Sequence, residues 1–197
     1  MSKKKNEILV PAGLQQVLLH ACCAPCSSAI VEWMLENGIR PVIFYYNPNI
    51  YPQKEYMIRK DESKRHADMV GVEWIDGDYD HDRWLDCVSG LECQPERGAR
   101  CMRCFEMRLI ASAREAQKLQ MKFFTTTLAS SRWKDLEQVS KAGLVAQNCV
   151  EGTVFWAQNW RKGGLYERRN QLLREYGFYN QQYCGCEFSM RRLQCDK

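Results

Sequence analysis

The sequence lacks any long uninterrupted run of hydrophobic residues. No apolar stretch approaches the ~18 residues of a membrane-spanning helix, and no apolar segment with a small-residue cleavage site follows Met1. These absences predict a soluble, cytoplasmic protein with no membrane partner. The length of 197 residues and the hydrophobic content of 45% suffice for one domain with a substantial core. We therefore expect a single domain over residues 1–197, in which residues 1–13 form a flexible tail.

Glycine is absent from the place where a nucleotide-binding loop would need it. The stretch from His20 to Ser28 follows the first predicted strand and contains no glycine. A phosphate-binding loop requires glycines so that backbone amides can approach the ligand. This absence argues against an ATP pyrophosphatase or an ATP-dependent thiolation enzyme. Cysteine is abundant instead, and eleven cysteines without an export signal are better explained by metal ligation or thiol chemistry than by disulfides.

Short apolar runs alternate with helical patterns along the chain. Strands are predicted at residues 16–21, 41–46, 72–75, 122–128 and 153–156. Helices are predicted after a cap at Ser27 or Ser28, and at residues 54–70, 81–88, 104–119 and 135–148. This alternation predicts an α/β fold with a parallel, Rossmann-like sheet covered by helices on both faces. We expect the segment from about residue 158 to 197 to form an irregular or helical C-terminal extension.

The cysteines form three groups that are far apart in the sequence. A C-x-x-C pair at a strand-to-helix turn, as in the first group, is also typical of thioredoxin-like redox sites. A second C-x-x-C favours metal binding, and the last group is a C-x-C in which Gly185 allows a tight turn around a shared centre. The groups are Cys22, Cys23 and Cys26; Cys101 and Cys104; Cys184 and Cys186. The isolated cysteines Cys87, Cys93, Cys149 and Cys195 are expected to be ordinary buried or surface residues.

The seven grouped cysteines exceed what one tetrahedral metal site can use. A structural zinc site takes four thiolates, and a four-iron four-sulfur (4Fe-4S) cluster also takes four. The surplus favours a cluster with a second role for the remaining thiols, either a neighbouring metal ion or a redox-active pair. Structural zinc and dithiol chemistry without a metal remain as alternatives.

Five motifs follow one another in order between residues 16 and 192. They are residues 19–27 with the adjacent cysteines, 46–50 with Glu55 and Tyr56, 96–108 with an Arg-Cys-x-x-Cys-Phe core, 124–128, and 183–186 with Ser189. Together they resemble the QueH family of epoxyqueuosine reductases. The resemblance implies a fold similar to the adenine-nucleotide α-hydrolase-like (HUP) superfamily, with cysteines replacing the nucleotide-binding loop. It also implies two-electron removal of the epoxide oxygen from epoxyqueuosine at the tRNA anticodon wobble position, which gives queuosine.

The resemblance further implies a 4Fe-4S cluster, a second iron nearby and no cobalamin. We expect Cys101, Cys104 and Cys184 to bind the cluster together with Cys22 or Cys23, and the other grouped thiols to serve the second site. Cys26 could instead cap the following helix. The expected catalytic residues are Cys22, Cys23 and Glu55. His20 is a second candidate proton donor, although its place at the end of a buried strand favours a core role.

Polar residues near the carboxyl ends of the strands are candidates for substrate binding, because ligands of parallel sheets bind there. Turn formation and strand preference are alternative explanations for asparagine and threonine at these positions. The expected partners are the tRNA anticodon stem-loop carrying epoxyqueuosine and an external electron donor such as a flavodoxin or ferredoxin. A zinc-stabilised RNA-binding module without redox activity is the alternative function. The expected substrate-binding residues are Asn47, Asn49, Tyr51, Thr126, Thr127 and Ser131.

Overall fold

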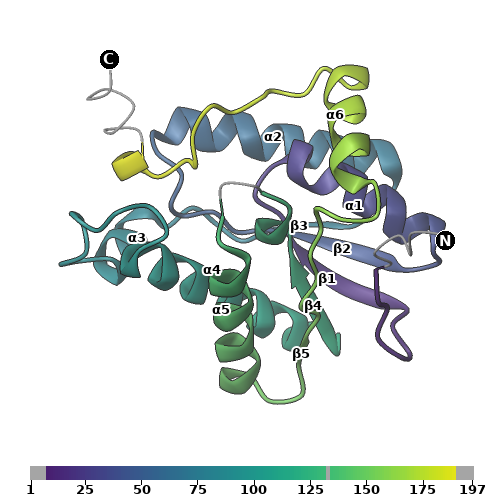
Figure 1. Cartoon of the computed structure of the whole chain (residues 1–197), viewed down its shortest axis with the longest axis horizontal. Helices are drawn as coiled ribbons and strands as arrows, with labels where there is room; N and C mark the ends of the chain where they lie inside the picture. Colours follow the sequence, from purple (N-terminus) through teal and green to yellow (C-terminus); the bar gives the residue numbers. More distant parts are fainter. Residues whose placement is uncertain (1–7, 132–133, 190–197) are drawn as a thin grey trace, which may run out of the picture.

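A single parallel sheet forms the centre of the molecule. The computed structural model describes residues 8–131 and 134–189. Its strands are β1 (Gln16–His20), β2 (Arg40–Tyr45), β3 (Trp74–Asp76), β4 (Phe123–Thr126) and β5 (Val154–Phe155). They lie in the order β3-β2-β1-β4-β5, and every neighbouring pair is parallel (Figure 1). The predicted Rossmann-like α/β fold is confirmed.

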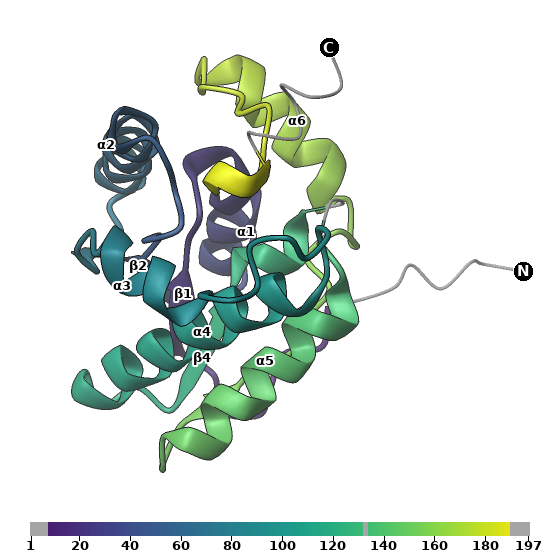
Figure 2. The same cartoon turned by 90° about the vertical axis from the view of Figure 1, so that its left-hand side faces the viewer.

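Helices cover both faces of this sheet. On one face α1 packs against α2 and α6, and on the other α4 packs against α5, so the sheet is the middle layer of three (Figure 2). Among the described residues, no helix is long and apolar enough to cross a membrane. The helices are α1 (Ala24–Glu36), α2 (Gln53–Val70), α3 (His81–Cys87), α4 (Ala99–Lys118), the short 3-10 helix η1 (Thr127–Ser130), α5 (Leu136–Cys149) and α6 (Leu165–Glu175).

The central strand β1 explains where a ligand can enter. Val17, Leu18 and Leu19 are completely buried, as expected for a strand covered on both faces. β1 pairs with β2 on one side and with β4 on the other. The strand order reverses between β1 and β4, so the chain leaves these two strands toward opposite helical layers. Such a reversal opens a crevice at the carboxyl edge of the sheet.

Two helices begin earlier than predicted, and both differences place cysteines in helical turns. α1 begins at Ala24 because Pro25 is well suited to a first helical turn. The Ser27 hydroxyl therefore donates back to the Cys23 carbonyl (3.2 Å) and is not the helix cap. α4 begins at Ala99, five residues before the predicted start at 104. Both cysteines of the second C-x-x-C consequently lie on α4, about one turn apart.

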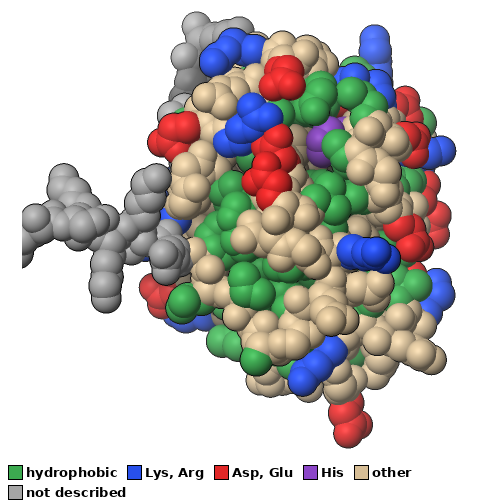
Figure 3. Space-filling model, turned by 90° about the vertical axis from the view of Figure 1, so that its right-hand side faces the viewer, with side chains coloured by type: hydrophobic (Ala, Val, Ile, Leu, Met, Phe, Trp, Pro, Cys, Tyr) green, Lys and Arg blue, Asp and Glu red, His purple; other side chains and the backbone are tan. Residues whose placement is uncertain are grey.

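The C-terminal extension contains a helix that packs against the first half of the fold. Arg168 of α6 contacts both carboxylate oxygens of Glu32 on α1, each at 2.6 Å. Of the expected flexible tail, Ile8 packs against the core and the Leu9 carbonyl accepts a hydrogen bond from Trp156 (3.0 Å). Residues 1–7 and 190–197, which include Cys195, lie outside the described residues. On the face shown in Figure 3, acidic and basic side chains are interspersed.

Candidate metal centre

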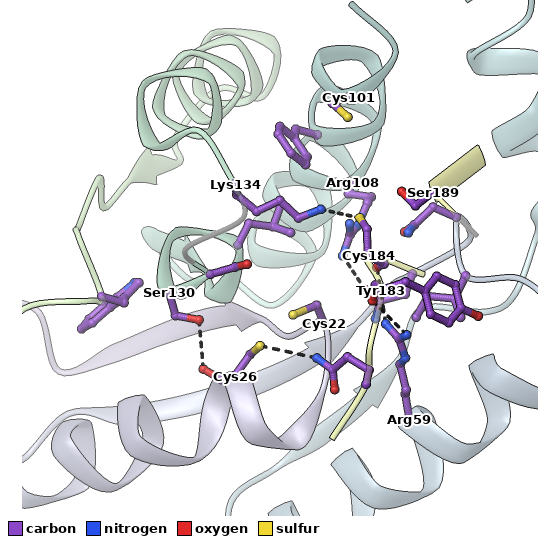
Figure 4. Close-up of a pocket in the computed structure, with 18 of the residues that line it drawn as sticks. Cys22, Cys26, Arg59, Cys101, Arg108, Ser130, Lys134, Tyr183, Cys184 and Ser189 are labelled. Atoms are coloured by element: carbon purple, nitrogen blue, oxygen red, sulfur yellow. Dashed lines mark hydrogen bonds between the residues drawn. The ribbon is translucent and has the colours of Figure 1, made fainter. Parts of the chain in front are cut away.

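A cavity of about 710 Å³ lies beyond the carboxyl ends of β1 and β4. Cys22 and Cys26 line it from the segment after β1, and Ser131 lines it from the segment after β4. Cys101 of α4 and Cys184 of the C-terminal segment complete the sulfur-containing part of the wall (Figure 4). Three distant parts of the sequence therefore contribute thiols to one cavity, which occupies the position where a Rossmann-like sheet binds its ligand.

The cysteines after β1 form a compact triad. The sulfur atoms of Cys22, Cys23 and Cys26 all lie within 4.8 Å of one another. Cys23 has an extended backbone at the N-cap of α1, and Cys26 lies in the first turn of that helix. The Cys22 amide donates to the Thr127 hydroxyl (3.1 Å), which in turn donates to the Cys22 sulfur (3.3 Å). Thr127 therefore fixes the triad to the segment that follows β4.

The triad holds one thiolate between two thiols. Hydrogen bonds from Cys23 and Cys26 lower the pKa of Cys22 well below its usual range. Burial raises the pKa of Cys23, and the hydrogen bond to Cys22 raises the pKa of Cys26 to about 12. Gln181 covers the triad from the C-terminal segment and donates its amide to the Cys23 sulfur (2.9 Å). Cys22 therefore has the lowest pKa of the three thiols.

The other four grouped cysteines lie between α4 and the C-terminal segment. Cys104 and Cys186 are buried in one small cluster with Trp84. A hydrogen bond from Cys186 lowers the pKa of Cys184, which is therefore the second thiolate of the cavity. The charge of this thiolate is one of the factors that raise the pKa of Cys101, although burial is the largest. Unlike those of the triad, the sulfurs of these four cysteines do not form a group of three or more within 4.8 Å of one another in the part of the chain that the structure describes.

Backbone contacts hold the C-x-C in position. The Gly185 carbonyl accepts a hydrogen bond from the Tyr51 amide (2.8 Å), and Arg59 donates to the carbonyls of Tyr183 (3.3 Å) and Cys184 (3.4 Å). Gly185 has a φ of 112°, and a Cβ atom at this residue would lie 3.0 Å from the Arg59 guanidinium. Glycine is therefore favoured here, because a side chain would strain the backbone.

Five cationic side chains line the cavity: Arg59, Arg97, Arg108, Lys134 and Arg169. No carboxylate of the described residues forms an ion pair with Arg108 or Lys134. Arg108 of α4 is 2% exposed and donates to the Asn47 side-chain oxygen. The Lys134 amino group donates to the Cys184 sulfur and lies over the Phe105 ring, 5.6 Å from its centre. Burial opposes the charge on Lys134, but the Cys184 thiolate outweighs it and raises the lysine pKa. The cavity thus pairs its thiolates with positive charge.

His20 is a buried core histidine. Its Nε2 donates to the Tyr46 carbonyl (3.1 Å), and its Nδ1 accepts from the Thr126 hydroxyl (2.8 Å). Burial, with help from the charge of Arg108, lowers the pKa of His20 to about 3. The imidazole is therefore neutral at physiological pH and has no proton to give to a ligand.

Glu55 lies behind the cavity wall and does not line the cavity itself. Its carboxylate forms a buried ion pair with Arg59 (2.7 Å) and accepts a hydrogen bond from the Tyr179 hydroxyl (2.9 Å). Arg59 does line the cavity. The contacts of Glu55 therefore orient the arginine that faces the ligand space.

The expected substrate-binding residues divide into two sets. Asn47 is fixed by donation to the Ala21 carbonyl (2.9 Å), whereas the side-chain oxygen of Asn49 is buried without a hydrogen-bond partner. Such an unpartnered acceptor suggests a missing donor. Asn47, Asn49 and Ser131 line the cavity; Tyr51, Thr126 and Thr127 do not, and contact His81, His20 and Cys22 instead.

The residues present fit a metal centre bound by thiolates. The sulfurs of the triad are close enough together to hold one ion, and thiolates are the preferred ligands of iron–sulfur clusters and of structural zinc. The cationic neighbours supply the positive charge that buried anionic sulfur requires. Sequence reasoning missed the roles of Arg108 and Lys134. Arg108 ends one of the five motifs, which was a usable signal, whereas Lys134 meets Cys184 across 50 residues of sequence and gives no local signal.

A Rossmann-like fold with cysteines gathered at its switch point defines an α/β protein with a thiolate-rich metal site. A family model described as "Epoxyqueuosine reductase QueH" matches residues 17–192. Curated proteins named epoxyqueuosine reductase QueH are similar to this chain along most of their length. The one from Haemophilus influenzae is 43% identical, covering 95% of this chain and 76% of the relative. Those from Histophilus somni and Acinetobacter baylyi are 44% and 42% identical, covering 95% and 97% of this chain and 77% and 88% of the relatives.

The chain belongs to the QueH family of epoxyqueuosine reductases. It is therefore an enzyme, an oxidoreductase of queuosine biosynthesis.

Proposed function

We propose that this chain removes the epoxide oxygen from epoxyqueuosine at the wobble position of a tRNA anticodon, using a 4Fe-4S cluster and a second iron. The reaction consumes two electrons and two protons, breaks both C–O bonds of the epoxide, forms a carbon–carbon double bond and releases water. The observation that carries the proposal is the gathering of cysteines from three distant segments around one cavity in a QueH family member. When bound, the metal centre supplies single electrons and a Lewis acid for the oxygen.

The division of the thiols keeps the groups seen in the sequence, and the cavity lining decides only between Cys22 and Cys23. We assign Cys101, Cys104 and Cys184 to the cluster, together with Cys22. Cys22 is preferred to Cys23 as the fourth ligand because it lines the cavity with Cys101 and Cys184. Cys23 and Cys26 remain for the second iron, whereas Cys186 contacts Cys184 and Ser189.

The cavity is large enough for a nucleoside as well as metal. Its volume of about 710 Å³ lies in the ordinary range for small-molecule sites. The side-chain oxygen of Asn49, which has no partner, can accept a hydrogen bond from a hydroxyl of the substrate. Ser131 lines the cavity from the segment after β4. Tyr166 and Arg169 of α6 line the same cavity, and this combination suits a stacked base with a neighbouring phosphate.

Glu55, expected to be catalytic, acts in this proposal by orienting Arg59 toward the ligand. The electrons come from a small external donor such as a flavodoxin or ferredoxin, and the reaction takes place in the cytoplasm. The substrate is the anticodon stem-loop of a tRNA. The tRNA substrate and the electron donor do not depend on which cysteines bind which iron.

Turnover can be tested directly. Anaerobically reconstituted protein is incubated with epoxyqueuosine-containing tRNA and a low-potential reductant, and the nucleosides are then analysed by mass. We expect the modified nucleoside to lose the mass of one oxygen atom. Unchanged epoxyqueuosine in the presence of an intact, reduced cluster would refute the proposal and favour an RNA-binding module stabilised by metal.

A further inference from the structure

Arg108 and Lys134 line the cavity, and neither has a carboxylate partner among the described residues. Arg59, which also lines the cavity, is neutralised by Glu55 at 2.7 Å. Arg108 is almost completely buried, yet its hydrogen bonds go to neutral oxygen atoms of Asn47 and Tyr46. A buried cation without an anion costs several kcal/mol. Its counter-ions are therefore the sulfur atoms of the cavity and whatever anionic group they bind.

The position of Arg108 brings its charge close to both groups of cysteines. Arg108 follows Cys101 and Cys104 on α4 at a spacing of seven and four residues, so all three lie on one side of the helix. Arg108 lines the same cavity as Cys22 and Cys184. Figure 4 shows Arg108 beside Cys184.

Lys134 reaches the same sulfur from the segment before α5. Its ammonium group donates to Cys184, and the Phe105 ring is its other neighbour. The Lys134 carbonyl accepts a hydrogen bond from Arg161 (2.7 Å), which fixes the backbone from which the side chain extends. The hydrogen bond to Cys184 points the positive charge of Lys134 at a sulfur atom of the cavity.

We propose that Arg108 and Lys134 are positioning residues that raise the reduction potential of the metal centre by acting as its built-in countercharges. This inference rests on the proposed function, because it requires a redox-active centre in the cavity. Each electron taken from the external donor adds one negative charge to a centre already surrounded by thiolates. Fixed positive charges stabilise the more negative, reduced state more than the oxidised one, and they do so strongly where water is excluded.

The test compares midpoint potentials of the reconstituted protein and its variants, measured by redox titration with electron paramagnetic resonance, together with iron content. Lys134→Gln and Arg108→Gln remove the charges, and Lys134→Arg and Arg108→Lys keep them. Lys118→Gln, at an exposed position at the end of α4, is the matched control. We expect each neutral variant to bind wild-type iron and to have an equilibrium constant for reduction at least about tenfold lower, or about 59 mV for one electron. The charge-conserving variants and the control should stay within about threefold of the wild type.

Two results would overturn the proposal. The first is an equilibrium constant for reduction of Lys134→Gln that stays within about twofold of the wild-type value. The same holds if this constant falls no further in Lys134→Gln than in Lys134→Arg. The second is loss of iron from a folded Lys134→Gln, which would assign the lysine to assembly. If Arg108→Gln does not fold, because the hydrogen bond to Asn47 is weakened, the Lys134 pair decides alone. The redox-active iron of the wild type is measured before any variant is compared. Wild-type protein that binds no such iron would contradict the proposed function instead.

Discussion

At the scale of single residues, the site is a set of thiols whose negative charges are matched by cations. Cys22 and Cys184 are the two thiols whose pKa is lowered, and each accepts a hydrogen bond from a neighbouring thiol. His20, the residue most often associated with proton transfer, is neutral and fully bonded inside the core. Cysteine, lysine and arginine side chains, and not this histidine, line the cavity.

Grouped and isolated cysteines should respond differently to substitution. Cys101→Ser removes a thiol that lines the cavity, whereas Cys149→Ser changes an exposed cysteine at the end of α5. We expect Cys101→Ser to bind clearly less iron and to lose at least about 100-fold in turnover. Iron analysis and the turnover assay on both variants check this. Wild-type iron content in Cys101→Ser would remove Cys101 from the ligand set.

His66 makes the stability of the fold depend on pH. It is 2% exposed and lies edge-on to Tyr176 and Phe178, and burial, assisted by Arg65, lowers its pKa to about 4 while Glu32 opposes the shift. The unfolded chain therefore binds a proton near pH 6.5 that the folded chain rejects until about pH 4, so stability falls on acidification through this window.

The size of this effect can be isolated with His66→Gln. Between pH 7 and pH 5, the wild type should lose up to about 2 kcal/mol more unfolding free energy than the variant. Urea titrations of both proteins at the two pH values measure the difference, and the contribution of His20 cancels because both proteins contain it. Equal losses in the two proteins would contradict the account of His66.

At the scale of helices and strands, the sequence predicted which elements exist better than where they begin. The apolar runs of β1 and β2 were clear because both strands are buried on two sides. The starts of α1 and α4 were misplaced, because the serines at 27–28 resembled a cap and the cysteines at 101 and 104 did not resemble helix formers. Contacts with the cavity and the core decide these boundaries, and local preferences do not show them.

Gly143 in α5 shows packing overriding helix preference. A Cβ atom there would lie 2.1 Å from the Phe155 ring of β5. Alanine favours an exposed helix by up to about 1 kcal/mol over glycine, but overpacking of a core costs about 1–3 kcal/mol. We therefore expect Gly143→Ala to lower the unfolding free energy by roughly 1–2 kcal/mol, measured by urea denaturation. Asn148→Ala at an exposed position of α5 should change it by less than about 0.5 kcal/mol, and a stabilising Gly143→Ala would show that α5 does not pack on β5 in this way.

At the scale of the whole molecule, the site exists only because the C-terminal segment returns to the first loop of the sheet. Gln181 reaches Cys23 across 158 residues, and Arg59 holds the carbonyl of Cys184 across 125. The sequence indicated that the cysteine groups belong together, since seven thiols in three groups suggest a shared centre. It did not indicate that Arg108 and Lys134 lie beside the cysteines, or that Glu55 does not line the cavity. Both features depend on long-range packing.

The central claim, that this reductase works through iron held by the grouped cysteines, is tested most directly by comparing metal-loaded forms of one preparation. The protein is stripped with a chelator, reloaded anaerobically with iron and sulfide or with zinc, and assayed on epoxyqueuosine-containing tRNA with a low-potential reductant. We predict about four or more irons per chain and formation of queuosine in the iron form only. Queuosine formation by the zinc form, or an iron-loaded form that reduces no substrate, would contradict the account.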